Sequence, residues 1–236
     1  MKILIFWLLG GLIGELLLAG QPLSTTKNPE LKRSSVVRKI SVTVERKTGD
    51  KVERMDPAHV FATGELVRFR FQANFPGYLY VLNHSTSGRD VLLFPKEETG
   101  LDNRIDKDRE YIMPMTESGW FKMELPAGHE VTYWVVSPLK LSGRLGEIGG
   151  DATVPAASSM TPRCDDSIFQ ARGDCVDVTA GPQPVKRRED VPESLSGLIG
   201  ANPRELTVTK NGKATSVLVP ASGNEPLIYT FRLAHK

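Results

Sequence analysis

The chain has 236 residues, of which 40% are hydrophobic and 25% are charged. These proportions are ordinary for a soluble globular protein, and the length suits one domain with extensions and a real core. The formal net charge of +2 is too small to indicate a nucleic-acid partner. The basic excess is local, since residues 27–54 hold nine Lys or Arg against four Asp or Glu. This is typical of a solvated face, with contact to anionic lipid or a polyanionic wall as the alternative.

Residues 1–20 have the pattern of an export segment. Lys2 precedes an apolar run over Ile3–Ala19, and small residues close that run, as in a secretory signal peptide. The run also reaches the lower limit for crossing a bilayer, roughly 17 residues, so an uncleaved N-terminal membrane anchor is the alternative. Residues 21–35 follow as a polar linker with two prolines. We therefore expect an exported protein, in the periplasm or at the cell surface, that meets a membrane only through this segment.

Alternating apolar residues predict strands from residue 36 onward. The segments RKISVTVER at 38–46 and LVRFRFQ at 66–72 both have a period of two, which a half-buried strand requires. In FPGYLYVLNHSTSGRDVLLFP, residues 75–95, the first run is apolar or aromatic on both faces. This indicates a strand covered on both sides. A polar turn and a second apolar run make the stretch a β-hairpin, with its tyrosines in the core rather than in a binding site.

Later strands are predicted at VTYWVVS, residues 131–137, and at LIYTFRLAH, residues 227–235. Between residues 204 and 220, Asn211-Gly212 is a type I′ turn candidate within a second hairpin. Strands dominate, and no long helical pattern separates them, so the predicted class is all-β: an antiparallel β-sandwich, immunoglobulin-like or jelly-roll-like, with long irregular insertions. We expect a single domain over residues 36–236, made of a core at 58–138, a loop-rich insertion at 139–203 and C-terminal strands at 204–236.

The two cysteines, Cys164 and Cys175, lie eleven residues apart in the loop-rich insertion. An exported protein reaches an oxidising compartment, where a close pair usually forms a disulfide. A metal pair is the alternative, but no further His or Cys near them completes a tetrahedral set. We therefore predict a disulfide between Cys164 and Cys175.

The order of motifs over residues 58–138 resembles the bacterial family called "domain of unknown function 4384". Its members show a Gly-Glu strand opening, a Gly-Tyr-aromatic hairpin, a Leu-Phe-Pro close and a later Pro-x-Gly turn before an apolar strand. The positions that carry this pattern here are Gly64, Glu65, Gly77, Tyr78, Tyr80, Leu93, Phe94, Pro95, Pro126 and Gly128. The resemblance implies an exported or surface module and brings no established active site with it.

Motifs of catalysis and cofactor binding are missing from the sequence. The four histidines lack ligand spacing, and there is no GxSxG elbow, P-loop or GxGxxG. Asp102, Asp106 and Asp108 lack the spacing of an EF-hand loop. We therefore expect no cofactor and no metal, and a protein that is not an enzyme. A hydrolase with dispersed catalytic residues is the alternative, and it would need His59, His84 or His129 beside a carboxylate and a hydroxyl.

Aromatic and turn residues are the remaining site candidates. Trp120 and Trp134 offer stacking faces for a sugar, peptide or lipid, although filling the sandwich core is the simpler role for both. His84 and Arg89 lie in or beside the hairpin turn and complete the candidate binding surface. The leading hypothesis is a non-enzymatic exported module of the cell envelope that binds a protein partner or ligand. A carbohydrate-binding module is a further alternative, and it would need two exposed coplanar aromatics.

Overall fold

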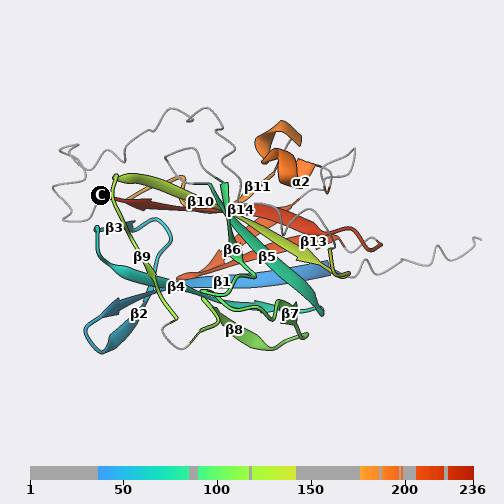
Figure 1. Ribbon diagram of the computed structural model, residues 1–236, viewed down its shortest axis with the longest axis horizontal. Coiled ribbons are helices and arrows are strands. Elements are labelled where there is room, and N and C mark those ends of the chain that lie inside the picture. Colours follow the sequence, from blue (N-terminus) through green and yellow to red (C-terminus); the bar gives the residue numbers. More distant parts are fainter. Residues whose placement is uncertain are drawn as a thin grey trace, which may run out of the picture. The chain divides into compact units, whose positions relative to one another are not determined.

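The computed structural model in Figure 1 describes residues 37–84, 90–116, 119–141, 176–185, 188–196, 198, 206–220 and 223–236. Contacts divide the chain into two units, Met1–Ser34 and Ser35–Lys236, and every described residue belongs to the second. The predicted export segment, linker and disulfide therefore lie outside the described residues. Within the described ranges, the structure contains no helix whose length and apolarity would let it cross a membrane.

Two β-sheets form two packed layers (Figure 1). The first sheet has the order β12 (Thr207–Asn211), β13 (Ala214–Pro220), β1 (Val37–Thr48), β4 (Leu66–Ala73), β8 (Glu110–Met113), with β2 (Lys51–Met55) paired to β1 and β9 (Phe121–Lys122) paired to β4. The second has the order β11 (Gly181–Pro184), β14 (Leu227–His235), β10 (Gly128–Ser137), β5 (Gly77–His84), β6 (Asp90–Phe94), with β3 (Val60–Phe61) paired to β14 and β7 (Arg104–Ile105) paired to β5. All these pairs are antiparallel except β14 with β3. The prediction of an all-β sandwich is confirmed.

The main core lies between the two sheets and is built by the alternation seen in the sequence. Val67, Phe69 and Phe71 of β4 all point inward and are at most 3% exposed. They meet Trp134 of β10, whose ring lies 5.3 Å from that of Phe69 and 5.6 Å from that of Phe71. Tyr229 of β14 stacks against Trp134, with 5.9 Å between the ring centroids. An aromatic cluster of this size contributes both apolar area and edge-to-face contacts.

A second, smaller core covers the outer face of the second sheet. Tyr80 and Leu82 of β5 pack there against Leu195 of the short helix α2 (Glu193–Ser196), which follows the 3-10 turn η2 (Arg188–Asp190). The Tyr80 hydroxyl accepts a hydrogen bond from the backbone N–H of Leu141 at 2.9 Å. Leu79 and Val81 point the other way, into the main core. The strand is therefore covered on both faces, as predicted, and Figure 1 shows α2 beside the second sheet.

Both predicted hairpins are present. Strand β5 pairs with β6, and the register shifts so that Val81 faces Phe94 while Leu82 faces Leu92. Leu93 is thus the extra residue of a β-bulge, which re-aims its side chain. In the second hairpin Asn211 faces Ala214 and only Gly212 of the turn has a positive φ, at 60°. The turn therefore lies one residue later than predicted, with glycine at its first central position, as in a type II′ turn.

Strand β11 was not predicted, because two of its four residues are prolines. Proline cannot donate to a β-ladder, so it is confined to edge strands and bulges. Among the described strands, β11 is the outermost of its sheet and pairs only with β14. The edge position is what makes Gly181–Pro184 acceptable as a strand.

Replacing Tyr229 with phenylalanine is expected to raise the free energy of unfolding by up to about 1 kcal/mol. Tyr229 is 0% exposed, and its hydroxyl has no hydrogen-bond partner among the described residues. Burial alone raises the pKa of this hydroxyl well above its ordinary value, which marks an apolar surrounding. Urea denaturation of the two proteins measures the difference. A marked loss of stability in Tyr229→Phe would mean that the hydroxyl does have a partner.

Candidate functional site

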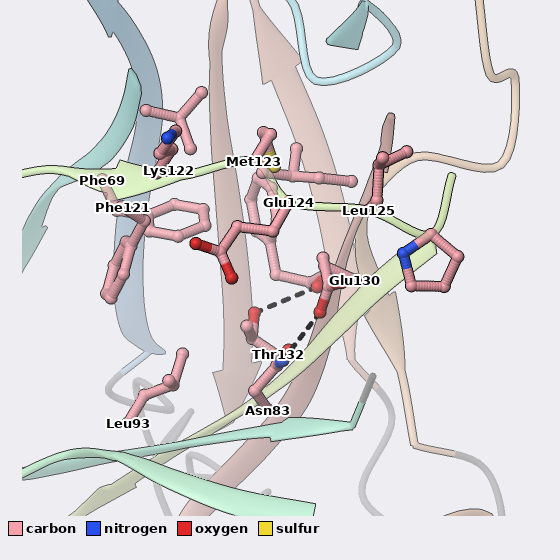
Figure 2. A pocket seen from close by; sticks show the side chains of 14 residues that line it. Phe69, Asn83, Leu93, Phe121, Lys122, Met123, Glu124, Leu125, Glu130 and Thr132 are labelled. Carbon is pink, nitrogen blue, oxygen red and sulfur yellow. Dashed lines mark hydrogen bonds between the residues drawn. The ribbon is translucent and has the colours of Figure 1, made fainter. Parts of the chain in front are cut away.

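A cavity of about 410 Å³ opens between the two sheets at one end of the sandwich. We call it the inter-sheet cavity. Its walls come from β4, β9, β5, β6, β10 and β14 and from the segment that joins β9 to β10 (Figure 2). Its lining residues are Val67, Phe69, Asn83, Leu93, Phe121, Lys122, Met123, Glu124, Leu125, Pro126, Glu130, Thr132, Phe231 and Leu233. Its volume falls in the range of about 300–1,000 Å³ that is usual for small-molecule sites.

The cavity exists because the chain crosses from one sheet to the other at this end. Strand β9 pairs with β4 of the first sheet, and residues 123–127 then lead to β10 of the second. Leu125 is 74% exposed in this crossing segment, at the rim of the cavity. The bulge in β6 brings Leu93 to the cavity from the opposite wall.

One side of the cavity is apolar. Phe69 and Phe121 lie edge to face at 6.4 Å, and Phe69 also contacts Phe231 at 5.3 Å. Val67 and Leu233 extend this surface. Aromatic and aliphatic walls of this kind bind the apolar part of a ligand by removing it from water.

The other side carries polar groups from β5 and β10. The side-chain amide of Asn83 donates a hydrogen bond to Oε2 of Glu130 at 2.7 Å, drawn as a dashed line in Figure 2. The Thr132 hydroxyl donates to the backbone carbonyl of Phe231 at 3.0 Å and accepts from Nε1 of Trp134 at 3.0 Å. The Glu130 side chain is 26% exposed. These bonds hold Glu130 and Thr132 in fixed positions at the cavity wall.

His235, the last residue of β14, lies next to this polar wall without lining the cavity. Its Nε2 is 3.4 Å from Oε1 of Glu130, and the residue is 0% exposed. Both ring nitrogens lack a hydrogen bond within the described part of the chain, and so does Oδ1 of Asn83. Buried polar atoms are normally bonded, so this wall retains unused hydrogen-bonding capacity.

The residues that the sequence singled out are not brought together. Trp134 is 0% exposed in the main core, so it offers no binding face. Trp120 is half-buried, and the Arg68 guanidinium lies over its ring at 4.3 Å. His84 is half-buried on β5, opposite Val131 of β10. Arg89 lies outside the described residues, as do Cys164 and Cys175.

Sequence reasoning missed Asn83, Glu130 and Thr132, although a signal for them exists. In GHEVTYWVVS the residues Glu130, Thr132 and Trp134 share one face of the strand. Trp134 fixes that face as the inward one, so a carboxylate and a hydroxyl at the preceding inward positions indicate a polar site inside the sandwich. A charged residue at an inward-facing position near the end of a strand is therefore the sequence signal for such a site.

A second polar cluster lies outside the cavity, around His129. Nδ1 of His129 is 3.6 Å from the carboxylate of Asp177, and Nε2 is 2.9 Å from the Arg232 guanidinium. Burial raises the pKa of Asp177, but hydrogen bonds from Thr179 and Arg232 outweigh it and hold that pKa below its ordinary value. The guanidinium therefore occupies the place that a nucleophile would take in a hydrolytic triad, and the arrangement is that of a structural ion pair.

Within the described ranges, no group of three or more His, Cys, Asp or Glu side chains is placed to hold a metal ion.

Comparison with known proteins gives one match. Residues 60–140 match the family model described as "Domain of unknown function (DUF4384)", whereas no curated protein and no solved structure matches the chain. Gly77 of the family pattern has a steric cause, since a Cβ there would lie 2.5 Å from the carbonyl oxygen of Ser137. All residues of the inter-sheet cavity except Phe231 and Leu233 fall within the matched region. The resemblance predicted from the sequence is confirmed: residues 60–140 match the model of the DUF4384 family.

Proposed function

We propose that this protein is a non-enzymatic, exported β-sandwich module of the cell envelope or surface that binds its ligand in the inter-sheet cavity. The observation that carries the proposal is the cavity itself. It combines an apolar aromatic side with a few fixed polar groups, which is the usual composition of a small-molecule site. The export segment predicted at residues 1–20 supports the location.

The polar groups of the cavity support binding rather than catalysis. The Thr132 hydroxyl is committed to the Phe231 carbonyl and to Trp134, so it is held as a structural group rather than poised as a nucleophile. Glu130 is held by Asn83 and lies beside His235. These contacts fix the wall in one arrangement, and a pre-formed wall lowers the entropy cost of binding.

The test uses N-phenyl-1-naphthylamine, a neutral probe that fluoresces in apolar surroundings, with the full-length protein purified from the envelope or medium fraction of the expressing cells. We expect the wild-type protein to bind the probe with a saturable rise in fluorescence. Leu93→Trp should lower the affinity for the probe at least tenfold, because the larger side chain fills the cavity from the β6 bulge. Leu139→Trp is the matched control, since Leu139 is 55% exposed beyond the far end of β10.

Circular dichroism spectra and thermal melting curves verify that each variant is folded. The wild type and the two variants are measured in the same buffer at the same probe concentration, so that the background fluorescence of the probe is equal for all three. Equal binding by all three would contradict the cavity as the site. Recovery of the protein from the cytoplasm alone would contradict export.

A further inference from the structure

The polar wall of the inter-sheet cavity contains a hydrogen-bond acceptor that no donor of the described residues pairs. The Asn83 amide group is oriented by its bond to Glu130, because only its NH₂ can donate to the carboxylate. Its carbonyl oxygen Oδ1 is thereby turned away, buried and without a partner among the described residues. A buried acceptor left unpaired is unfavourable, so this wall lacks a hydrogen-bond donor.

The neighbouring groups also accept hydrogen bonds rather than donate them. A carboxylate offers roughly four acceptor positions, and Asn83 occupies only one of those on Glu130. Figure 2 shows the side chain of Glu124 extending from the crossing segment into the same cavity. The donor of Thr132 is already used on the Phe231 carbonyl. Apart from the second N–H of Asn83, the free capacity of the groups that line this wall is therefore for donors. His235 lies beside Glu130 but does not line the cavity.

Charge favours the same kind of ligand. Two carboxylates, Glu124 and Glu130, and one ammonium, Lys122, line the cavity, which gives −1 for the lining. Lys122 lies at the upper left of Figure 2, away from Glu130. A cation beside Glu130 would be attracted, and an anion there would be repelled and left without donors.

Resting on the function proposed above, we infer that the cavity binds a small amphipathic cation. A primary ammonium would sit against the Glu130 carboxylate, where its three donors and lack of acceptors match the free acceptor positions of the wall. The apolar body would lie against Phe69, Phe121 and Phe231. This arrangement uses the two sides of the cavity for the two ends of one molecule.

Three ligands with one chain and different headgroups test the inference: octylammonium, octanol and octanoate. Each is titrated against the full-length protein loaded with N-phenyl-1-naphthylamine. We expect octylammonium to displace the probe at a concentration at least tenfold lower than octanoate, with octanol between them. Glu130→Gln should weaken octylammonium about tenfold and leave octanol within about twofold, because the isosteric amide keeps the shape of the wall and removes its charge.

Glu98→Gln is the matched control, since it removes one negative charge at an exposed position outside the cavity and should change none of the three affinities. Equal displacement by the three headgroups would overturn the cation preference and leave the proposed function standing. Absence of probe binding to the wild type would overturn both. If Glu130→Gln does not fold, the comparison of headgroups on the wild-type protein decides alone.

Discussion

Replacing Trp134 with alanine is expected to lower the free energy of unfolding by about 3–5 kcal/mol. The indole is 0% exposed, touches Phe69, Phe71, Tyr229 and Phe231 from both sheets, and donates its N–H to Thr132. Its removal leaves a large void that the surrounding strands cannot close. A domain of this kind has a total stability of about 5–15 kcal/mol, so the variant would be close to unfolding at 37 °C.

Urea denaturation followed by far-ultraviolet circular dichroism measures this loss without relying on tryptophan fluorescence. Trp120→Ala is the control, because Trp120 is half-buried and contacts Arg68; its loss should be smaller, about 1–2 kcal/mol. Equal losses at the two positions would contradict the assignment of Trp134 as the centre of the core.

Replacing Glu45 with glutamine is expected to lower the free energy of unfolding by about 2–3 kcal/mol at neutral pH. The Glu45 side chain is 4% exposed on the outer face of β1, where Nε of Arg68 donates to it at 2.7 Å and Nε of Arg70 at 2.6 Å. The variant leaves these guanidinium groups without their carboxylate. The loss stays below that of a fully buried pair because both arginines are partly exposed and Arg70 keeps its contact with Glu110.

The loss should also depend on pH, with a definite sign. Burial raises the pKa of Glu45, but the hydrogen bonds and charges of Arg70 and Arg68 outweigh it and hold the pKa below its ordinary value. A carboxyl whose pKa is lowered by folding stabilises the protein above its unfolded pKa of about 4.3, and this contribution is lost as pH falls through the folded value. The difference between wild type and Glu45→Gln should therefore be constant above about pH 5 and shrink below about pH 4.

Denaturation in urea at neutral pH and at about pH 3 measures this dependence. Glu97→Gln, at an exposed position, should leave stability nearly unchanged at both. A difference for Glu45→Gln that grew toward acid pH would show that the carboxylate destabilises the fold.

The sandwich could be predicted from the sequence because the alternation of apolar and polar residues in its strands matches their burial pattern. Period-two alternation identified β1 and β4, and apolar residues on both faces identified β5 as covered on both sides. The same reasoning could not find β11, since its prolines oppose strand formation everywhere except at a sheet edge. Nor could it find the bulge at Leu93, because alternation assumes an unbroken register.

The candidate site was not predictable from the residues that stand out in the sequence. Trp134 is conspicuous but fills the core, and Trp120 is covered by Arg68. The cavity instead joins residues from six strands and one crossing segment, so its members are distant along the chain and ordinary one by one. Only the inward position of Glu130 carried a local signal, and reading it requires knowing which face of β10 is buried.

The strand order has a consequence for what can fold independently. Residues 60–140, which carry the family match, supply β4, β8 and β9 to one sheet and β3, β5, β6, β7 and β10 to the other. Strand β1 pairs along β4, and β14 pairs along β10, and both come from outside that segment. Excised alone, the segment would present two long unpaired strand edges and half of an aromatic core to water, which favours aggregation. The family match therefore covers the middle of a larger folding unit, and β1 and β14, which lie outside the match, are needed to complete its two sheets.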